Sequence, residues 1–224
     1  MPRPKRKRNF GALRRRRKKR RRTKRLPLNG FPSSKMVRLR YCTEVSLTGS
    51  STYVFRANSL FDPDLTGVGE QPANFGRWMA VYDHYTVVGS KIRVMYAPTT
   101  STNALTAYCG IYLSDDGTSA AAMTSYDIME QSKNRSMNKV IGIPSSRIPW
   151  ITKTFSAKKF FGKPNSTMIG DGTYRGTDAT NPTEGAYFEL YTKSVGGNTP
   201  GTFNFMVYID YIAVLTEAKE DEDA

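Results

Sequence analysis

Histidine and cysteine are scarce in this chain of 224 residues, which contains one of the first and two of the second. His84 has no sequence-local partner for acid–base catalysis, and no GxSxG motif supplies a nucleophile. Cys42 and Cys109 lack the paired spacing of a zinc site. Because two cysteines alone cannot establish a disulfide, both are expected to be buried, unpaired residues. A turn explains Asp62 and Asp64 as well as a calcium site does. We therefore predict no enzyme activity, no metal and no other cofactor.

Long hydrophobic runs are also missing. No apolar stretch approaches the roughly 18 to 20 residues that span a membrane. The N-terminal segment lacks the apolar region of a secretory signal. These absences predict a protein that is neither inserted into a membrane nor exported.

Acidic residues are absent from residues 1–25, where 16 of the 25 positions are Lys or Arg. The segment also has few apolar residues, and their burial cannot offset the entropy of ordering the chain. This basic arm is therefore predicted to be disordered. Its flexible charges would bind DNA or RNA in a salt-dependent manner without reading sequence. The same composition is typical of nuclear import signals. The basic residues are Arg3, Lys5, Arg6, Lys7, Arg8, Arg14, Arg15, Arg16, Arg17, Lys18, Lys19, Arg20, Arg21, Arg22, Lys24 and Arg25.

The rest of the chain is nearly neutral. Taking those sixteen from the 34 basic residues leaves 18, against 19 acidic residues, which is a net formal charge of −1. The division predicts an arm and hinge over 1–34, one folded domain over 35–216 and an acidic, mobile tail over 217–224. We therefore expect the arm to bind a polyanion and the folded domain to have a different role.

Alternating apolar and polar residues predict strands in the folded domain. In the run 86–96, Val88 and Ile92 are expected on the same buried face. Long, turn-rich connections separate the runs, which favours an all-β, eight-stranded antiparallel jelly-roll sandwich over a small closed barrel. The strong runs are 37–47, 86–96, 105–113, 186–192 and 203–215, and the weaker ones are 52–57, 138–143 and 151–161.

Two short helices are predicted inside the connections. Asn74 could cap a turn that runs to Tyr82, and Ser119 could cap the segment 119–130.

Some basic residues of the folded domain are candidates for contacts with nucleic acid. The segment KTFSAKKFFGK at 153–163 interleaves lysines with phenylalanines, which could clamp single strands. The phenylalanines would serve equally well as the core face of a strand, with the lysines in water. The candidates for an inner surface are Arg38, Arg40, Lys91, Arg93, Lys153, Lys158, Lys159 and Lys163.

The arm, the strand KMVRLRYCTEVSL at 35–47 and the stretch FDPDLTGVGEQPANFGRWMAVYDHYTVVGSKIRVMYAP at 61–98 together resemble a known family. This family is the capsid proteins of circovirus-like, Rep-encoding viruses with circular single-stranded DNA. The similarity is clearest over the arm and 36–98, and the second half matches in the order of its elements. It implies a jelly-roll subunit, sixty of which form a T=1 icosahedral shell with the arms inside on the genome.

The resemblance further implies a protein of the virion and the host nucleus, with import receptors as partners and a host attachment factor that the sequence does not identify. Sixty such arms would neutralise on the order of a thousand phosphates, which suits a small circular genome. A coat protein of a small or satellite RNA virus could share the arm and the jelly roll. A cellular RNA-binding protein would have a basic folded surface, and a nuclease would have clustered acids.

Overall fold

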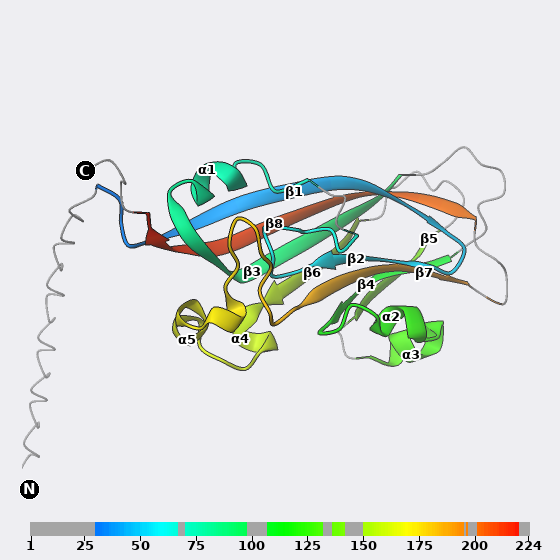
Figure 1. Ribbon diagram of the computed structural model, residues 1–224. Helices are drawn as coiled ribbons and strands as arrows, with labels where there is room; N and C mark the ends of the chain where they lie inside the picture. Colours follow the sequence, from blue (N-terminus) through cyan, green and yellow to red (C-terminus); the bar gives the residue numbers. More distant parts are fainter. Residues whose placement is uncertain are drawn as a thin grey trace, which may run out of the picture.

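The computed structural model describes residues 30–66, 70–97, 107–131, 136–141, 150–194, 196 and 201–219. In that part of the chain, two four-stranded antiparallel sheets lie face to face, with strand orders β1-β8-β3-β6 and β2-β7-β4-β5 (Figure 1). The strands are β1 Ser34–Thr48, β2 Thr52–Arg56, β3 Tyr82–Ala97, β4 Ala107–Ser114, β5 Ser136–Ile141, β6 Trp150–Ser156, β7 Tyr187–Ser194 and β8 Thr202–Ala218.

Strands from the two ends of the domain lie side by side. β1 pairs with β8 from Ser34 opposite Thr216 to Thr48 opposite Thr202. Among the described strands, β4 and β5 are the one neighbouring pair that is also consecutive in sequence. This order is that of a jelly roll and confirms the predicted fold.

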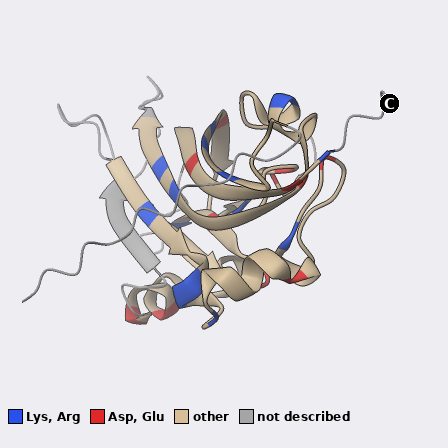
Figure 2. Cartoon of the chain, turned by 90° about the vertical axis from the view of Figure 1, so that its left-hand side faces the viewer, with Lys and Arg blue, Asp and Glu red and all other residues tan. Residues whose placement is uncertain are grey.

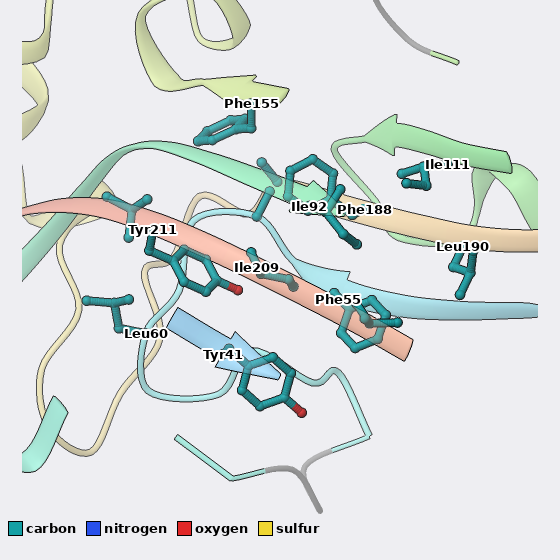
Figure 3. Close-up of a cluster of buried hydrophobic side chains, with 14 of the residues drawn as sticks. Tyr41, Phe55, Leu60, Ile92, Ile111, Phe155, Phe188, Leu190, Ile209 and Tyr211 are labelled. Carbon is teal, nitrogen blue, oxygen red and sulfur yellow. The ribbon is translucent and has the colours of Figure 1, made fainter. Parts of the chain in front are cut away.

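The core fills the space between the two sheets. From Phe203 to Leu215, every second residue of β8 points inward, and each of these seven side chains is at most 1% exposed. Such alternation is expected of strands with one face on a core. Figure 3 shows the core side chains Tyr41, Ile92, Ile209 and Tyr211 of the first sheet with Phe55, Ile111, Phe188 and Leu190 of the second.

Short helices cover the outer face of the second sheet. The side chain of Glu189 on β7 is fully buried there, and its Oε2 accepts a hydrogen bond from the backbone N–H of Ala120 at 2.7 Å. Tyr191 is buried on the same side. The helices in this region are α2, Ser119–Ala122, and α3, Ser125–Glu130, which lie beside β4 and β7 in Figure 1. No helix of the described residues is long and apolar enough to cross a membrane.

The predicted face of β3 is wrong at Val88. The register between β3 and β8 shifts between Val87 and Gly89, which marks a β-bulge. Val87 therefore faces the core and Val88 is half-buried, whereas Ile92 remains on the core face. A bulge adds one residue to one strand, so a strict period of two cannot follow a strand through it.

The weak run 151–161 is a strand only in its first part. β6 ends at Ser156, and residues 157–160 form the helix α4, Ala157–Phe160. The connection 162–185 holds a further helix, α5, Asn165–Gly170, and a 3₁₀ turn, Gly172–Tyr174. These short elements depend on tertiary packing, because isolated helices of this length are unstable.

The two predicted helix caps are wrong in detail. Helix α1, Phe75–Met79, begins where expected, but Asn74 has φ of 67° and its side chain makes no capping hydrogen bond. The segment 119–130 is two helices, and Ser119 lies inside the first of them. Thr124 caps the second through a capping box with Asp127.

The cysteines and the tail also differ from expectation. Both cysteines are free, and Cys109 is buried, but Cys42 is exposed on β1. β8 runs to Ala218, so the first residues of the predicted tail belong to the sheet, and Glu217 forms an ion pair with Arg175 at 2.7 Å. The predictions for the arm over 1–25, and for the end of the tail over 220–224, lie outside the described residues.

Candidate nucleic-acid interface

The outer face of the first sheet carries a regular array of polar side chains. One row across the strands contains Arg40, Asp210 and Lys91, which are direct neighbours in the register of β1, β8 and β3. The next row contains Tyr208 and Arg93. Figure 2 shows blue bands of Lys and Arg and red bands of Asp and Glu along the strands. The array arises because alternate residues of each strand share a face.

Asp210 is the centre of this array. Its carboxylate is 2.7 Å from Nε of Arg40, 2.9 Å from Nη2 of Arg93 and 3.4 Å from Nη2 of Arg38. The side chain of Asp210 is 6% exposed, whereas those of Arg38 and Arg40 are 67% and 55% exposed. One buried acid therefore orients three guanidinium groups that reach the surface.

The environment of Asp210 favours its ionised form. Burial alone opposes ionisation, but the hydrogen bond from Arg40 and the charges of Arg40, Arg38 and Arg93 outweigh it and hold the pKa of Asp210 below its ordinary value. Asp210 is thus a carboxylate at neutral pH. With Lys91 exposed on the same face, four cations stand against one anion in this group, which leaves a net formal charge of +3.

This arrangement suits the backbone of a nucleic acid. A guanidinium has five N–H donors, so contact with one carboxylate leaves donors for another anion. Arginines held in a fixed orientation can form charge-assisted hydrogen bonds to phosphate with little further loss of side-chain entropy. Contacts of this kind position a strand without reading its bases.

Lys153 is not part of this face, which corrects the sequence-based assignment. It lies opposite Ile92 in the register of β6 and β3, between the core residues Ile151 and Phe155. Its side chain points inward, and the residue is 5% exposed. Burial lowers the pKa of Lys153 to about 8. A lysine at an inward position of a strand cannot contact phosphate outside the sheet.

The other three lysines of 153–163 follow β6. Lys158 and Lys159 are exposed on α4, and Nζ of Lys163 lies 4.9 Å from the centre of the Tyr174 ring. The phenylalanines do not form a clamp for bases, because they pack on one another. The ring centres of Phe160 and Phe161 are 5.1 Å apart, and both rings contact Phe155.

Other candidate sites have structural explanations. Asp64 accepts hydrogen bonds from the backbone and side chain of Thr66, as in a turn, and from the hydroxyl of Tyr53. Nε2 of His84 is 3.3 Å from Glu217. The described residues contain no group of three or more His, Cys, Asp or Glu side chains that could hold a metal ion.

The alternation of the sequence indicates the outward arginines but not the acid that orients them. Asp210 is the single charged residue of the strongest strand run, 203–215. A lone acid inside an alternating run indicates a specific partner, because an unpaired buried charge is costly. That signal could have identified Asp210, although not its partners.

Replacing Asp210 with Ala should destabilise the fold, because three guanidinium groups lose the carboxylate that orients them. Loss of hydrogen bonds to a charged group should lower the free energy of unfolding by about 2 kcal/mol. Because the pKa of Asp210 is depressed, its contribution is present above pH 3.8, the ordinary value, and is lost as pH falls through the folded-state pKa. Denaturation curves recorded at several pH values would measure both the loss of stability and its pH dependence.

Asp83→Ala is the matched control for Asp210→Ala. It also removes one carboxylate, but this one is 47% exposed and lies 4.0 Å from Lys219. Equal losses of stability in the two variants would contradict the central role of Asp210.

Comparison with known proteins gives a likeness of fold. No protein-family model and no curated protein matches the sequence. A solved structure of Desmodium yellow mottle tymovirus is 12% identical over 88% of this chain and 95% of that one, with a TM-score of 0.44. The structure of Cocksfoot mottle virus is 10% identical over 88% of this chain and 90% of that one, with a TM-score of 0.49. The decameric BFDV capsid protein is 11% identical over 82% of this chain and 99% of that one, with a TM-score of 0.43. At these identities, the likeness concerns the fold alone.

Proposed function

We propose that this protein is the coat protein of a small virus with a circular single-stranded DNA genome. The division of charge between a basic arm and a nearly neutral jelly roll carries the coat-protein part of the proposal, and the sequence resemblance over the arm and residues 36–98 carries the choice of a DNA genome. Subunits with strongly charged bodies would repel one another on assembly, so a neutral body permits close packing. The arm concentrates the charge that a packaged genome requires.

We infer the orientation of the subunit in the shell from the first sheet. β1, the first strand after the arm and hinge, is an edge strand of this sheet, and the Asp210 array lies on the outer face of the same sheet. The outer face of the second sheet is occupied by α2 and α3. We therefore assign the Asp210 face to the lumen of the shell, where Arg38, Arg40, Lys91 and Arg93 would contact phosphate.

The experiment that tests the proposal is electron microscopy of the purified full chain. We expect closed icosahedral shells of sixty subunits that contain nucleic acid. Extraction and nuclease digestion would then distinguish a DNA cargo from an RNA cargo, because the charges of the arm suit both. A protein that stays monomeric at low and high salt, with and without nucleic acid, would contradict the proposal and favour a cellular RNA-binding protein.

Nuclear import is a separate part of the proposal. The basic clusters of residues 1–25 have the composition of an import signal. Host import receptors would bind the arm before assembly, and the genome would replace them in the shell. A fluorescent reporter that carries residues 1–25 and remains in the cytoplasm would contradict this part alone.

A further inference from the structure

Two aromatic side chains lie beside the Asp210 array on the outer face of the first sheet. Trp150 begins β6, and Tyr208 lies in the middle of β8. Their rings are stacked, with centres 6.3 Å apart and planes at 28°. They come from the two strands that flank β3, so the pair spans the width of that strand.

Tyr208 is in register with one of the cations, whereas Trp150 lies opposite Met95, two residues after Arg93 on β3. Arg93 on β3 lies directly opposite Tyr208 on β8 and opposite Thr152 on β6. Two residues before it, Lys91 occupies the next outward position, opposite Asp210. A strand rises about 3.3 Å per residue, so the two cations are about 7 Å apart along β3. Two aromatic rings and two cations that follow each other along β3 therefore share one surface.

Trp150 is unusually accessible for its residue type. It is 44% exposed, although tryptophan is highly buried on average. Its neighbours on this face, Met95 and Met206, are half-buried, and the sulfur of Met206 accepts a hydrogen bond from the hydroxyl of Tyr208 at 2.8 Å. The Tyr208 ring is thereby held in place as a support for the Trp150 ring.

We propose that Trp150, supported by Tyr208, is a stacking site for a base of single-stranded nucleic acid, whose adjacent phosphates contact Arg93 and Lys91. The combination of a positively charged surface and exposed aromatic rings binds single strands because every base has a π face. Duplex nucleic acid keeps its bases stacked on each other, so this site selects single strands. The inference rests on the proposed function and adds a base contact to the phosphate contacts of the arm.

Intrinsic fluorescence can test this site, because the chain has only two tryptophans. In full-length Trp78→Phe, which keeps Trp150, we expect oligothymidylate to quench the fluorescence. An abasic oligomer of equal length, which has the same phosphates and no bases, should bind through the arm without quenching. Labelled forms of both oligomers would report binding by anisotropy.

The affinities should show the same dependence on the base. At high salt, where phosphate contacts are weakened, Trp150→Ala should reduce the preference for oligothymidylate over the abasic oligomer about tenfold. Trp150→Phe keeps a ring and should retain part of the preference. Tyr126→Ala removes an aromatic side chain that is 75% exposed on helix α3, which covers the second sheet. This substitution should leave the preference unchanged.

The possible failures are distinguishable. Equal quenching by both oligomers, or binding of oligothymidylate without quenching, would overturn the stacking site and leave the proposed function intact. An unchanged preference in Trp150→Ala would overturn it too, and would indicate that the aromatic pair only stabilises the edge of the sheet. If neither oligomer binds at all, both the proposed function and this inference are wrong.

Discussion

Deletion of residues 2–25 should give shells that still assemble but contain no nucleic acid. The deletion removes all sixteen basic residues of the arm and leaves the folded domain intact. Each contact between a cation and a phosphate releases counterions, so under the proposed function we expect these charges to supply most of the affinity for a genome. The ratio of absorbance at 260 and 280 nm in purified particles, together with microscopy, would measure the loss.

The structure sets the boundary of this deletion. The hydroxyl of Tyr82 donates a hydrogen bond to the backbone carbonyl of Pro32 at 3.1 Å, and β1 begins at Ser34. A cut at residue 34 would therefore also disturb the fold, whereas a cut at residue 25 spares these contacts. A neutral Gly-Ser arm of the same length is the matched control for chain length. Particles of either variant that remain full of nucleic acid would contradict the packaging role.

Partial deletions separate the number of charges from their position. Residues 2–13 contain five basic residues and residues 14–25 contain eleven. For single strands, the logarithm of the binding constant falls with the logarithm of salt concentration by about 0.7 per neutralised phosphate. The slope of this salt dependence should therefore decrease about twice as much on deletion of 14–25 as on deletion of 2–13. A drop unrelated to charge count would indicate specific contacts within the arm.

Replacement of Ile209 with Ala should lower the free energy of unfolding by about 3 kcal/mol. Ile209 is fully buried in β8, the second strand of the first sheet, and lies between Tyr41 of β1 and Ile92 of β3. Its loss leaves a cavity where both sheets meet, and close-packed interiors relax only partly around such a cavity. Urea denaturation followed by circular dichroism of unassembled subunits would measure the change.

Ile212→Ala provides the control on the same strand. The chemical change is identical, but Ile212 is 41% exposed on the outer face. Its replacement should change the free energy of unfolding by no more than about 0.5 kcal/mol. Similar losses for both variants would mean that the two faces of β8 are wrongly assigned. A subunit weakened at Ile209 should also form shells that dissociate at lower temperature, because assembly stabilises only folded subunits.

The cations of the candidate interface could be predicted from the sequence, whereas their arrangement is visible only in the structure. Alternation placed Arg38, Arg40, Lys91 and Arg93 on outward faces, as the burial pattern confirms for β1 and β3. It could not place Asp210 among them, because that contact joins residues 170 positions apart in the chain. The stacked Trp150 and Tyr208 depend on strand pairing in the same way.

The sequence by itself determined most of the strands, most of their inward residues and the separation of charge between arm and domain. These features are local, because a strand alternates its side chains at every residue regardless of its neighbours. Only the tertiary structure decided the bulge at Val88, the inward side chain of Lys153 and the pairing of β1 with β8. Strand pairing is determined by the burial that the whole domain achieves, so no local pattern specifies which charges meet on the finished surface.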